Sequence, residues 1–190
     1  MKTKRKIFVI SGASGAGKDT ITSILAEKYK DISISPSVTT REQGTGDNKP
    51  GGKIYTYVSI KRFEEMIEEG FFFEYKKING HYYGTPKSEV FDLIKKGYKV
   101  LLILDVDGGL EMKQRFPESV LIFLKAPSIE ILKDRLIKRN RDSAEEIKKR
   151  LKRIDYENAK GNYYDYIVVN DILEKTIKEV ASIIFDGKMV

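Results

Sequence analysis

Short apolar runs alternate with longer amphipathic segments along most of this chain. The apolar runs are continuous, which is typical of strands that are buried on both faces of a parallel sheet. Four such runs lie at 6–11, 98–106, 120–124 and 166–169. Because helical patterns separate them, the sequence predicts an α/β fold in which helices flank a parallel sheet.

The helical segments carry recognisable start and stop residues. Pro86 and Gly97 have the spacing of a first helical residue and a C-terminal glycine. Residues 143–146 read Ser-Ala-Glu-Glu, which is a capping box for another helix. The remaining helices are predicted at 19–29, 59–69, 111–115, 128–139 and 172–185.

Residues 35–85 interrupt the alternation of strands and helices. The stretch 41–53 is rich in glycine and predicts a loop, whereas 71–79 and 81–84 predict two strands around a turn at Gly80. We interpret 35–85 as an antiparallel insertion into one domain. The core would then comprise about 1–34, 86–127 and 156–190.

Composition narrows the classes of function. The 190 residues include no cysteine and one histidine, which excludes disulfides, thiolate metal sites and cysteine nucleophiles. Apolar runs of five residues, such as 100–104, are too short to cross a bilayer. The apolar run near the start is also too short for a secretory signal. We therefore expect a cytoplasmic protein with no membrane contact.

Positive charge is concentrated in one segment. The net charge is +7, and residues 128–155 contain ten basic and six acidic residues. A solvated helical face, a nucleic-acid groove and a phosphate-binding segment all fit this excess. No dedicated nucleic-acid motif accompanies it, so we expect no nucleic-acid partner.

A glycine-rich segment after the first strand indicates a nucleotide site. Consecutive backbone N–H groups of such a loop can point at one anion, and the following helix adds a favourable dipole. A lysine at its end would reach the outer phosphates. The alternative is a glycine turn with a chance lysine. The loop consists of Gly12, Ala13, Ser14, Gly15, Ala16, Gly17 and Lys18.

One position departs from the usual phosphate-loop pattern. The residue after the lysine is normally Ser or Thr, whose hydroxyl binds Mg²⁺, but here it is Asp19, and Thr20 follows. A carboxylate can also hold Mg²⁺. We keep Asp19 and Thr20 as competing metal-binding candidates, beside the possibility that Asp19 only favours the helix dipole.

These motifs together resemble the guanylate kinase family over essentially the whole chain. They come in the order and approximate spacing of that family, although none is specific alone. The residues that carry the resemblance are 12–18, 37–41, 82–85, 104–107, Arg139 with Arg150, and 167–171.

The resemblance implies an activity and a division of the chain. The family has a phosphate-loop core, a GMP-binding part, which would be 35–85, and a lid, which would be 128–155. It implies ATP-dependent phosphorylation of GMP, and of dGMP, with Mg²⁺. We expect GMP and ATP as partners, and a monomer or small homo-oligomer.

The resemblance also implies roles for individual residues. Glu74 would accept hydrogen bonds from the donor edge of guanine, and Ser37 and Thr85 would satisfy the base near O6. The GMP phosphate would bind Arg41, Tyr55 and Tyr83. Asp105 and Asp107 would complete the GMP site, because strand ends in α/β sheets commonly carry ligand chemistry. Lys18, Arg139 and Arg150 would be catalytic, and Asn170 would contact ATP.

Two departures from the family pattern concern the GMP site. A second arginine usually follows the first by three residues, but that position is Gly44 here, and Lys49 is a possible substitute. The family's Asp-x-Asp-x-Gln-Gly becomes Asp107-Gly-Gly.

Two other functions remain open from the sequence. A kinase of the same fold could act on another phosphorylated acceptor, such as a ribose bisphosphate, but Ser37, Glu74 and Thr85 argue against it. A non-catalytic guanylate-kinase-like interaction module typically loses the lysine of the phosphate loop, and Lys18 is present.

Overall fold

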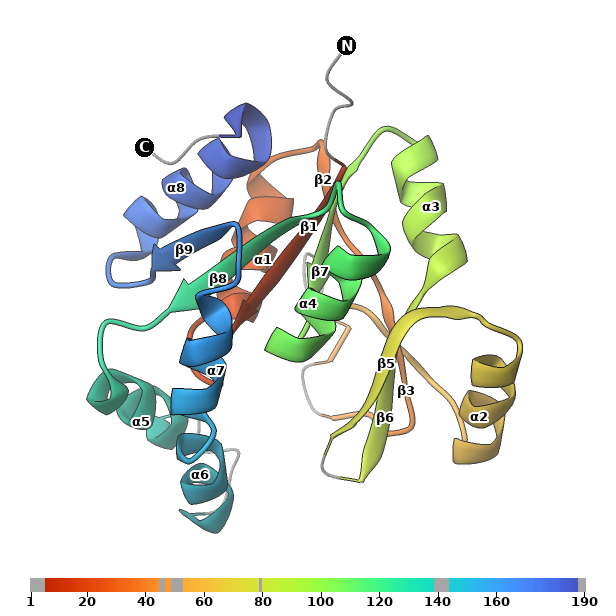
Figure 1. Cartoon of the computed structure of the whole chain (residues 1–190), viewed down its shortest axis with the longest axis horizontal. Coiled ribbons are helices and arrows are strands. Elements are labelled where there is room, and N and C mark those ends of the chain that lie inside the picture. The colour runs from red at the N-terminus through yellow and green to blue at the C-terminus, as the bar shows by residue number, and fades with distance from the viewer. Residues whose placement is uncertain (1–5, 45–46, 49–52, 79, 139–143, 188–190) are drawn as a thin grey trace.

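The computed structural model describes residues 6–44, 47–48, 53–78, 80–138 and 144–187. A parallel sheet with helices on both faces forms the main body, and a smaller sheet with one helix projects from it (Figure 1). This arrangement confirms the predicted fold class.

The main sheet has five parallel strands in the order β2-β7-β1-β8-β9. The central strand β1 is buried along its whole length, because it pairs on both edges and is covered on both faces. The strands are β1 (Ile7–Gly12), β2 (Ile32–Ile34), β7 (Lys99–Ile103), β8 (Val120–Lys125) and β9 (Tyr166–Val169).

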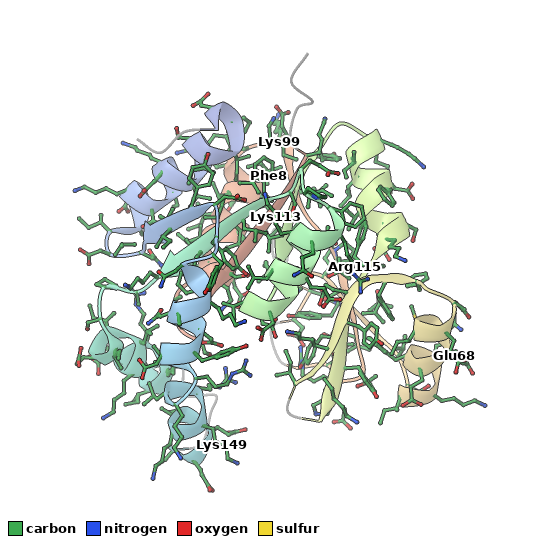
Figure 2. The ribbon with its side chains drawn as sticks, in the orientation of Figure 1. Phe8, Glu68, Lys99, Lys113, Arg115 and Lys149 are labelled. Atoms are coloured by element: carbon green, nitrogen blue, oxygen red, sulfur yellow. The ribbon has the colours of Figure 1, made fainter. Side chains whose placement is uncertain are left out.

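Helices cover the two faces of this sheet separately. On one face, α1 (Lys18–Lys28) and α8 (Leu173–Asp186) bury an apolar cluster that includes Phe8 (Figure 2). On the other face, α3 (Lys87–Lys95) and α4 (Val106–Arg115) bury a second cluster around Phe123. The continuous apolar runs of the strands follow from this double coverage.

The insertion forms a second sheet of four strands in the order β4-β3-β6-β5. We expected it to be antiparallel, and this is wrong for one pair, because β3 and β4 run parallel. The chain between them spans 40–54 and is long enough to return to the same end of the sheet. The elements are β3 (Ser37–Thr39), β4 (Tyr55–Tyr57), α2 (Ile60–Glu68), β5 (Phe72–Ile78) and β6 (His81–Pro86).

Three helices follow β8 and lead back to the sheet at β9. They are α5 (Ile129–Lys138), α6 (Ala144–Leu151) and α7 (Ile154–Gly161). α5 packs against α6, whereas α7 packs against α4 and the central strand β1. The predicted capping residue Ser143 lies outside the described residues.

Sequence patterns misplaced one strand end and one helix start. The strand predicted at 98–106 ends at Ile103, and the helix predicted at 111–115 begins at Val106. The side chain of Asp105 caps this helix by accepting a hydrogen bond from the N–H of Gly108 at 2.7 Å. Two adjacent glycines are poor helix formers, but the cap and the packing of Met112 outweigh them.

Other local predictions also need correction. Pro86 is the N-cap residue of α3 rather than its first helical residue, because it still pairs with Phe72 at the end of β6. The short strands β2 and β3 and the helix α7 were not predicted. Short segments carry too few residues for a period to be recognised. No helix within the described ranges is long and apolar enough to span a membrane.

Gly161 lies where α7 packs closely against Phe123 of the sheet. A Cβ atom at this position would lie 2.6–2.7 Å from three atoms of the Phe123 ring, which is fully buried. We expect Gly161→Ala to lower the free energy of unfolding by about 1–3 kcal/mol, because overpacking outweighs the better helix propensity of alanine.

Urea unfolding monitored by circular dichroism measures this loss. In the double variant with Phe123→Leu, the further loss from Gly161→Ala should be smaller, because the neighbouring ring is gone. Equal losses from Gly161→Ala in both backgrounds would contradict the close packing.

Candidate functional site

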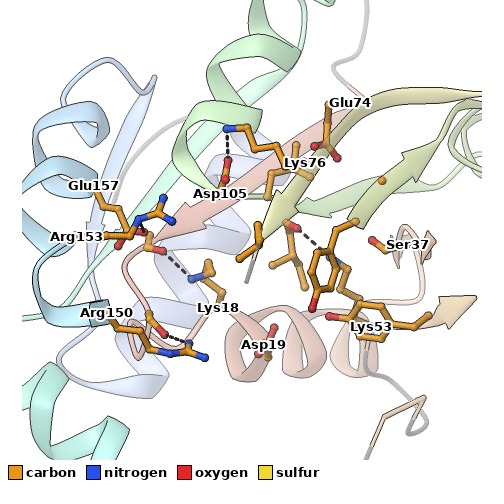
Figure 3. Close-up of a pocket in the computed structure, with 18 of the residues that line it drawn as sticks. Lys18, Asp19, Ser37, Lys53, Glu74, Lys76, Asp105, Arg150, Arg153 and Glu157 are labelled. Carbon is orange, nitrogen blue, oxygen red and sulfur yellow. Dashed lines mark hydrogen bonds and ion pairs between the residues drawn. The ribbon is translucent and has the colours of Figure 1, made fainter. Parts of the chain in front are cut away.

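A hollow of about 640 Å³ lies where the main sheet, the insertion and helices α6 and α7 meet. The phosphate loop after β1, the carboxyl end of β7, and helices α6 and α7 contribute to its walls. Figure 3 shows basic and acidic side chains from these separate elements turned toward this space. Ligands of α/β sheets commonly bind at this edge, beyond the carboxyl ends of the strands.

The predicted phosphate loop connects β1 to the N-terminus of α1. Gly17 is the N-cap of that helix, with a φ of 95° that favours glycine. A Cβ on Gly17 would also lie 2.3 Å from Nδ2 of Asn170, so no larger side chain fits there without a shift. The helix N-terminus behind the loop gives the N–H groups and the dipole that an anion needs.

Two predicted catalytic residues meet at this loop. Lys18 Nζ donates hydrogen bonds to the carbonyl of Gly12 at 2.7 Å and to that of Ala13 at 3.2 Å. Arg150 comes from α6 and donates to Oγ of Ser14 at 2.6 Å. The helical segment and the loop, which are far apart in sequence, therefore place a guanidinium and an ammonium in one hollow.

The two metal-binding candidates face different spaces. Both Asp19 and Thr20 are exposed, but Asp19 lines the large hollow, whereas Thr20 lines a smaller one of about 370 Å³. No cluster of three metal-binding side chains occurs in the part of the chain that the structure describes. Mg²⁺ bound to a nucleotide needs only one or two protein carboxylates besides the phosphates, so Asp19 fits that requirement.

The smaller hollow is lined by other residues of the phosphate loop, Gly15 and Gly17. Asn170 lines it and donates from Nδ2 to the carbonyl of Ala16 at 2.8 Å. Arg135 of α5 also lines it and donates to the carbonyl of Asn170 at 3.1 Å. The second guanidinium nitrogen of Arg135 is buried without a hydrogen-bond partner among the described residues. An unsatisfied buried donor of this kind is available to an acceptor from a water molecule or a ligand.

A β-bulge sets the position of Glu74. The register between β5 and β6 shifts between Phe72 and Tyr75, so Phe73 and Glu74 both lie opposite Thr85. Thr85 donates a hydrogen bond to Oε1 of Glu74 at 2.7 Å. Bulges commonly re-aim a side chain beside a functional site. Here the bulge buries Phe73 in the core and turns the next carboxylate into the hollow.

The electrostatic state of Glu74 reflects its burial. Only 7% of the residue is exposed, and burial raises its pKa because desolvation disfavours the charged form. The hydrogen bond from Thr85 and the charge of Lys53 oppose this rise without cancelling it. Ser37 is also buried and lines the same hollow. The carboxylate is therefore desolvated, and additional donors from a ligand would stabilise it.

Arg41 is held at the edge of the insertion by an acidic partner. Its guanidinium contacts Asp47 at 2.8 Å and lies 5.3 Å from the centre of the Tyr55 ring. Burial alone would raise the pKa of Asp47, but hydrogen bonds from Tyr57, Gly44 and Arg41 outweigh it and lower that pKa. Arg41 does not line the large hollow, whereas Tyr55 and Tyr83 do. The position of Lys49 lies outside the residues that the structure describes.

Asp105 and Asp107 belong to a network between the insertion and α7. Lys76 of β5 contacts Asp105 at 3.0 Å and Asp107 at 3.5 Å. Tyr156 of α7 donates a hydrogen bond to Asp107 at 2.7 Å. Burial opposes ionisation of Asp107, but the bond from Tyr156 and the charge of Lys76 lower its pKa. Asp105 lines the large hollow and Asp107 does not.

The structure brings together most of the predicted site residues and adds others. Thr85 does not line the large hollow, but it donates a hydrogen bond to Glu74, which does. Arg139 lies outside the residues that the structure describes. Several cations and carboxylates that reach the hollows from distant segments were not predicted from the sequence, because only the fold brings them there. They are Lys53, Lys76, Arg135, Glu146, Lys149, Arg153 and Glu157.

Known proteins similar to this chain include guanylate kinases. The protein-family model described as guanylate kinase matches residues 4–187. A guanylate kinase of Caldanaerobacter subterraneus subsp. tengcongensis is 42% identical over 188 residues, which cover 99% of this chain and 90% of that protein. One of Prochlorococcus marinus subsp. pastoris is 40% identical, covering 97% of this chain and 99% of that protein.

A solved structure agrees with these sequence matches. The crystal structure of guanylate kinase from Anaplasma phagocytophilum superposes with a TM-score of 0.77 at 29% identity. The match covers 100% of this chain and 89% of the other. Because the family model matches residues 4–187 and these two relatives are 42% and 40% identical, this chain belongs to the guanylate kinase family.

Proposed function

We propose that this protein is a guanylate kinase, which transfers the γ-phosphoryl group of ATP to GMP and forms ADP and GDP. The observation that carries the proposal is a buried carboxylate, Glu74, that shares one hollow with the phosphate-loop lysine, Lys18. A base-reading group and a phosphate-binding group at opposite ends of one space fit a nucleotide acceptor beside a nucleotide donor.

The donor site would extend over the phosphate loop into the smaller hollow. The loop N–H groups and Lys18 would bind the β- and γ-phosphates. Asn170 and the unsatisfied nitrogen of Arg135 line the adjoining space and are suited to the rest of ATP. Because α5 supplies Arg135 and α6 supplies Arg150, we infer that these helices act as a lid over the donor.

The acceptor site would lie against the insertion. Guanine presents N1–H and N2–H on one edge, and both can donate to the carboxylate of Glu74. Ser37 and Thr85 lie on the same insertion and would contact the base near O6, while Asp105 would contact GMP from the end of β7. Tyr55, Tyr83 and Arg41 would hold the GMP phosphate. Asp107 would act by anchoring Lys76 and α7, because it does not line the hollow.

Asp19 is the residue that we propose for Mg²⁺. It begins α1 beside Lys18 and lines the hollow that would hold the transferred phosphoryl group. Thr20 faces the smaller hollow and is the weaker candidate. When bound, Mg²⁺ would neutralise negative charge on the donor phosphates. Near those phosphates a carboxylate without a cation would be repelled.

The transfer itself requires positioning more than proton transfer. An oxygen of the GMP phosphate attacks the γ-phosphorus of ATP in line, and the bond between that phosphorus and the β–γ bridging oxygen breaks. The attacking oxygen is already ionised, so no general base is needed. Lys18 and Arg150 would stabilise the charge of the moving group, and closure of the lid would exclude water. Arg139 remains a further candidate for this role.

Nucleotide specificity tests the proposal directly. ADP release in a coupled assay with ATP and Mg²⁺ should be fast with GMP and slower by a factor of about 10⁴ in kcat/KM with AMP. Glu74 would be left without its two donors against adenine, and sites built on hydrogen bonds reject such analogues strongly. UMP and a ribose bisphosphate serve as further acceptors. Equal efficiency with AMP, or a preference for the ribose bisphosphate, would contradict the proposed function.

Glu74→Gln separates function from stability. The amide offers one acceptor oxygen instead of two, so kcat/KM for GMP should fall about 10- to 100-fold, as for a lost charged hydrogen bond. Because the pKa of Glu74 is raised on folding, the ionised carboxylate costs folding free energy at any pH above its unfolded value. Removal of the charge should therefore raise Tm at neutral pH.

The pH profile supplies the second readout for Glu74. In the wild-type protein, kcat/KM for GMP should fall as the pH is lowered through the raised pKa of Glu74, because the protonated group loses an acceptor. Glu74→Gln should lack this step. A variant that is both less active and less stable, with an unchanged pH profile, would assign Glu74 a structural role instead.

Arg150→Ala tests the catalytic lid. Its guanidinium already lies at the phosphate loop through Ser14, and a guanidinium that stabilises transferring phosphate contributes about 10³-fold or more to kcat. We expect that loss in kcat with a smaller change in the KM for GMP. Arg62→Ala, on the exposed surface of α2, is the matched control and should retain wild-type kcat. A wild-type kcat for Arg150→Ala would refute the role.

A further inference from the structure

Lys53 lines the large hollow, and the sequence predicted no role for it. It lies just before β4 and lines the space between the insertion and the phosphate loop. In Figure 3 it lies on the side of Ser37 and Asp19, opposite Arg150 and Arg153. We propose that Lys53 Nζ binds the phosphate of GMP and makes the acceptor site specific for the nucleotide over the nucleoside, an inference that rests on the proposed function.

The first support is that Lys76 and Arg153, which line the same hollow, have acidic partners, whereas Lys53 forms no ion pair among the residues that the structure describes. Lys76 contacts Asp105 at 3.0 Å, and Arg153 lies 3.9 Å from Glu157. Within the described ranges, the one hydrogen bond of Lys53 goes to the carbonyl of Ile103, at 3.0 Å. A neutral carbonyl leaves most of the charge of a partly buried ammonium uncompensated, so an anion would be favoured beside it.

The second support is the tyrosine ring that Lys53 shares with Arg41. Lys53 Nζ lies 5.4 Å from the centre of the Tyr55 ring, and the Arg41 guanidinium lies 5.3 Å from the same centre. Asp47 neutralises Arg41, but none of the carboxylates that the structure describes forms an ion pair with Lys53. A phosphate beside Tyr55 would attract both.

The third support is the location of Lys53 between the two ends of the hollow. The charges of Asp19, on the donor side, and Glu74, on the base-reading side, both act on Lys53 from beyond contact distance. If Glu74 reads guanine and the phosphate loop holds ATP, the GMP phosphate must lie between them to attack. Lys53 lines the same hollow as Glu74 and Asp19. Burial lowers the pKa of Lys53 by disfavouring its charged form, and a bound phosphate would oppose this effect.

The experiment compares GMP with guanosine, which lacks the phosphate. We expect Lys53→Met to raise the Kd for GMP by about 10- to 100-fold, the range for a hydrogen bond between charged groups, and to leave the Kd for guanosine unchanged. Calorimetry measures the first value and ligand-observed NMR the second. In turnover assays the KM for GMP should rise by a similar factor, with kcat within a few-fold of wild type. Lys61→Met, on the exposed surface of α2, should change neither ligand.

A second neutral variant guards against a loss of structure. Lys53→Gln keeps an N–H donor for the Ile103 carbonyl and should show the same phosphate-specific loss. If both variants weaken GMP and guanosine equally, or weaken neither, Lys53 only fastens the insertion to β7 and the inference is overturned. If the wild-type protein itself does not bind GMP, the proposed function fails together with it. Binding of GMP by wild type with no change in Lys53→Met overturns the inference alone.

Discussion

Everything at the site depends on the burial of β1 between two parallel neighbours. Because β7 and β8 pair with both of its edges and helices cover both of its faces, the end of β1 is fixed at Gly12. The phosphate loop begins there, and parallel pairing places the ends of the neighbouring strands at the same edge. The donor-binding N–H groups and the acid Asp105 are therefore set by one rigid sheet.

The acceptor side is supplied by the insertion, which joins the core through both apolar and polar contacts. Phe73 is buried in the second apolar cluster, whereas the contacts at the hollow are polar, such as Lys76 with Asp105 and Lys53 with the Ile103 carbonyl. Arg150 likewise reaches the phosphate loop through a hydrogen bond to Ser14. Polar contacts of this kind exchange readily for contacts with charged ligands, whereas the apolar clusters of the sheet do not. A rigid apolar sheet with exchangeable polar contacts at the hollow suits a protein whose two substrates must enter before water is excluded.

The parts of the site that sequence could predict are those with a local signal. The phosphate loop with Lys18 is recognised from its glycines, and Glu74 is recognised as a carboxylate within an apolar strand. The structure brings them to one hollow. Lys53, Lys76 and Arg135 could not be found in this way, because each becomes part of the site only when a distant segment folds over the strand ends. Asp105 lies two residues beyond the end of β7, and its additional role as the cap of α4 was missed because the two glycines that follow are poor helix formers.

Charge desolvation links the stability of this protein to its specificity. Glu74 and Lys53 are both held where burial disfavours their charged forms, and neither has a full counter-ion among the described residues. Each such group lowers the stability of the empty site, and each gains most from a ligand that presents the matching charge or donors. A guanine edge at one and a phosphate at the other relieve both costs together. A ligand with only one of these features leaves the other group unpaired, so selectivity for a guanine nucleotide follows from the same burial that destabilises the empty site.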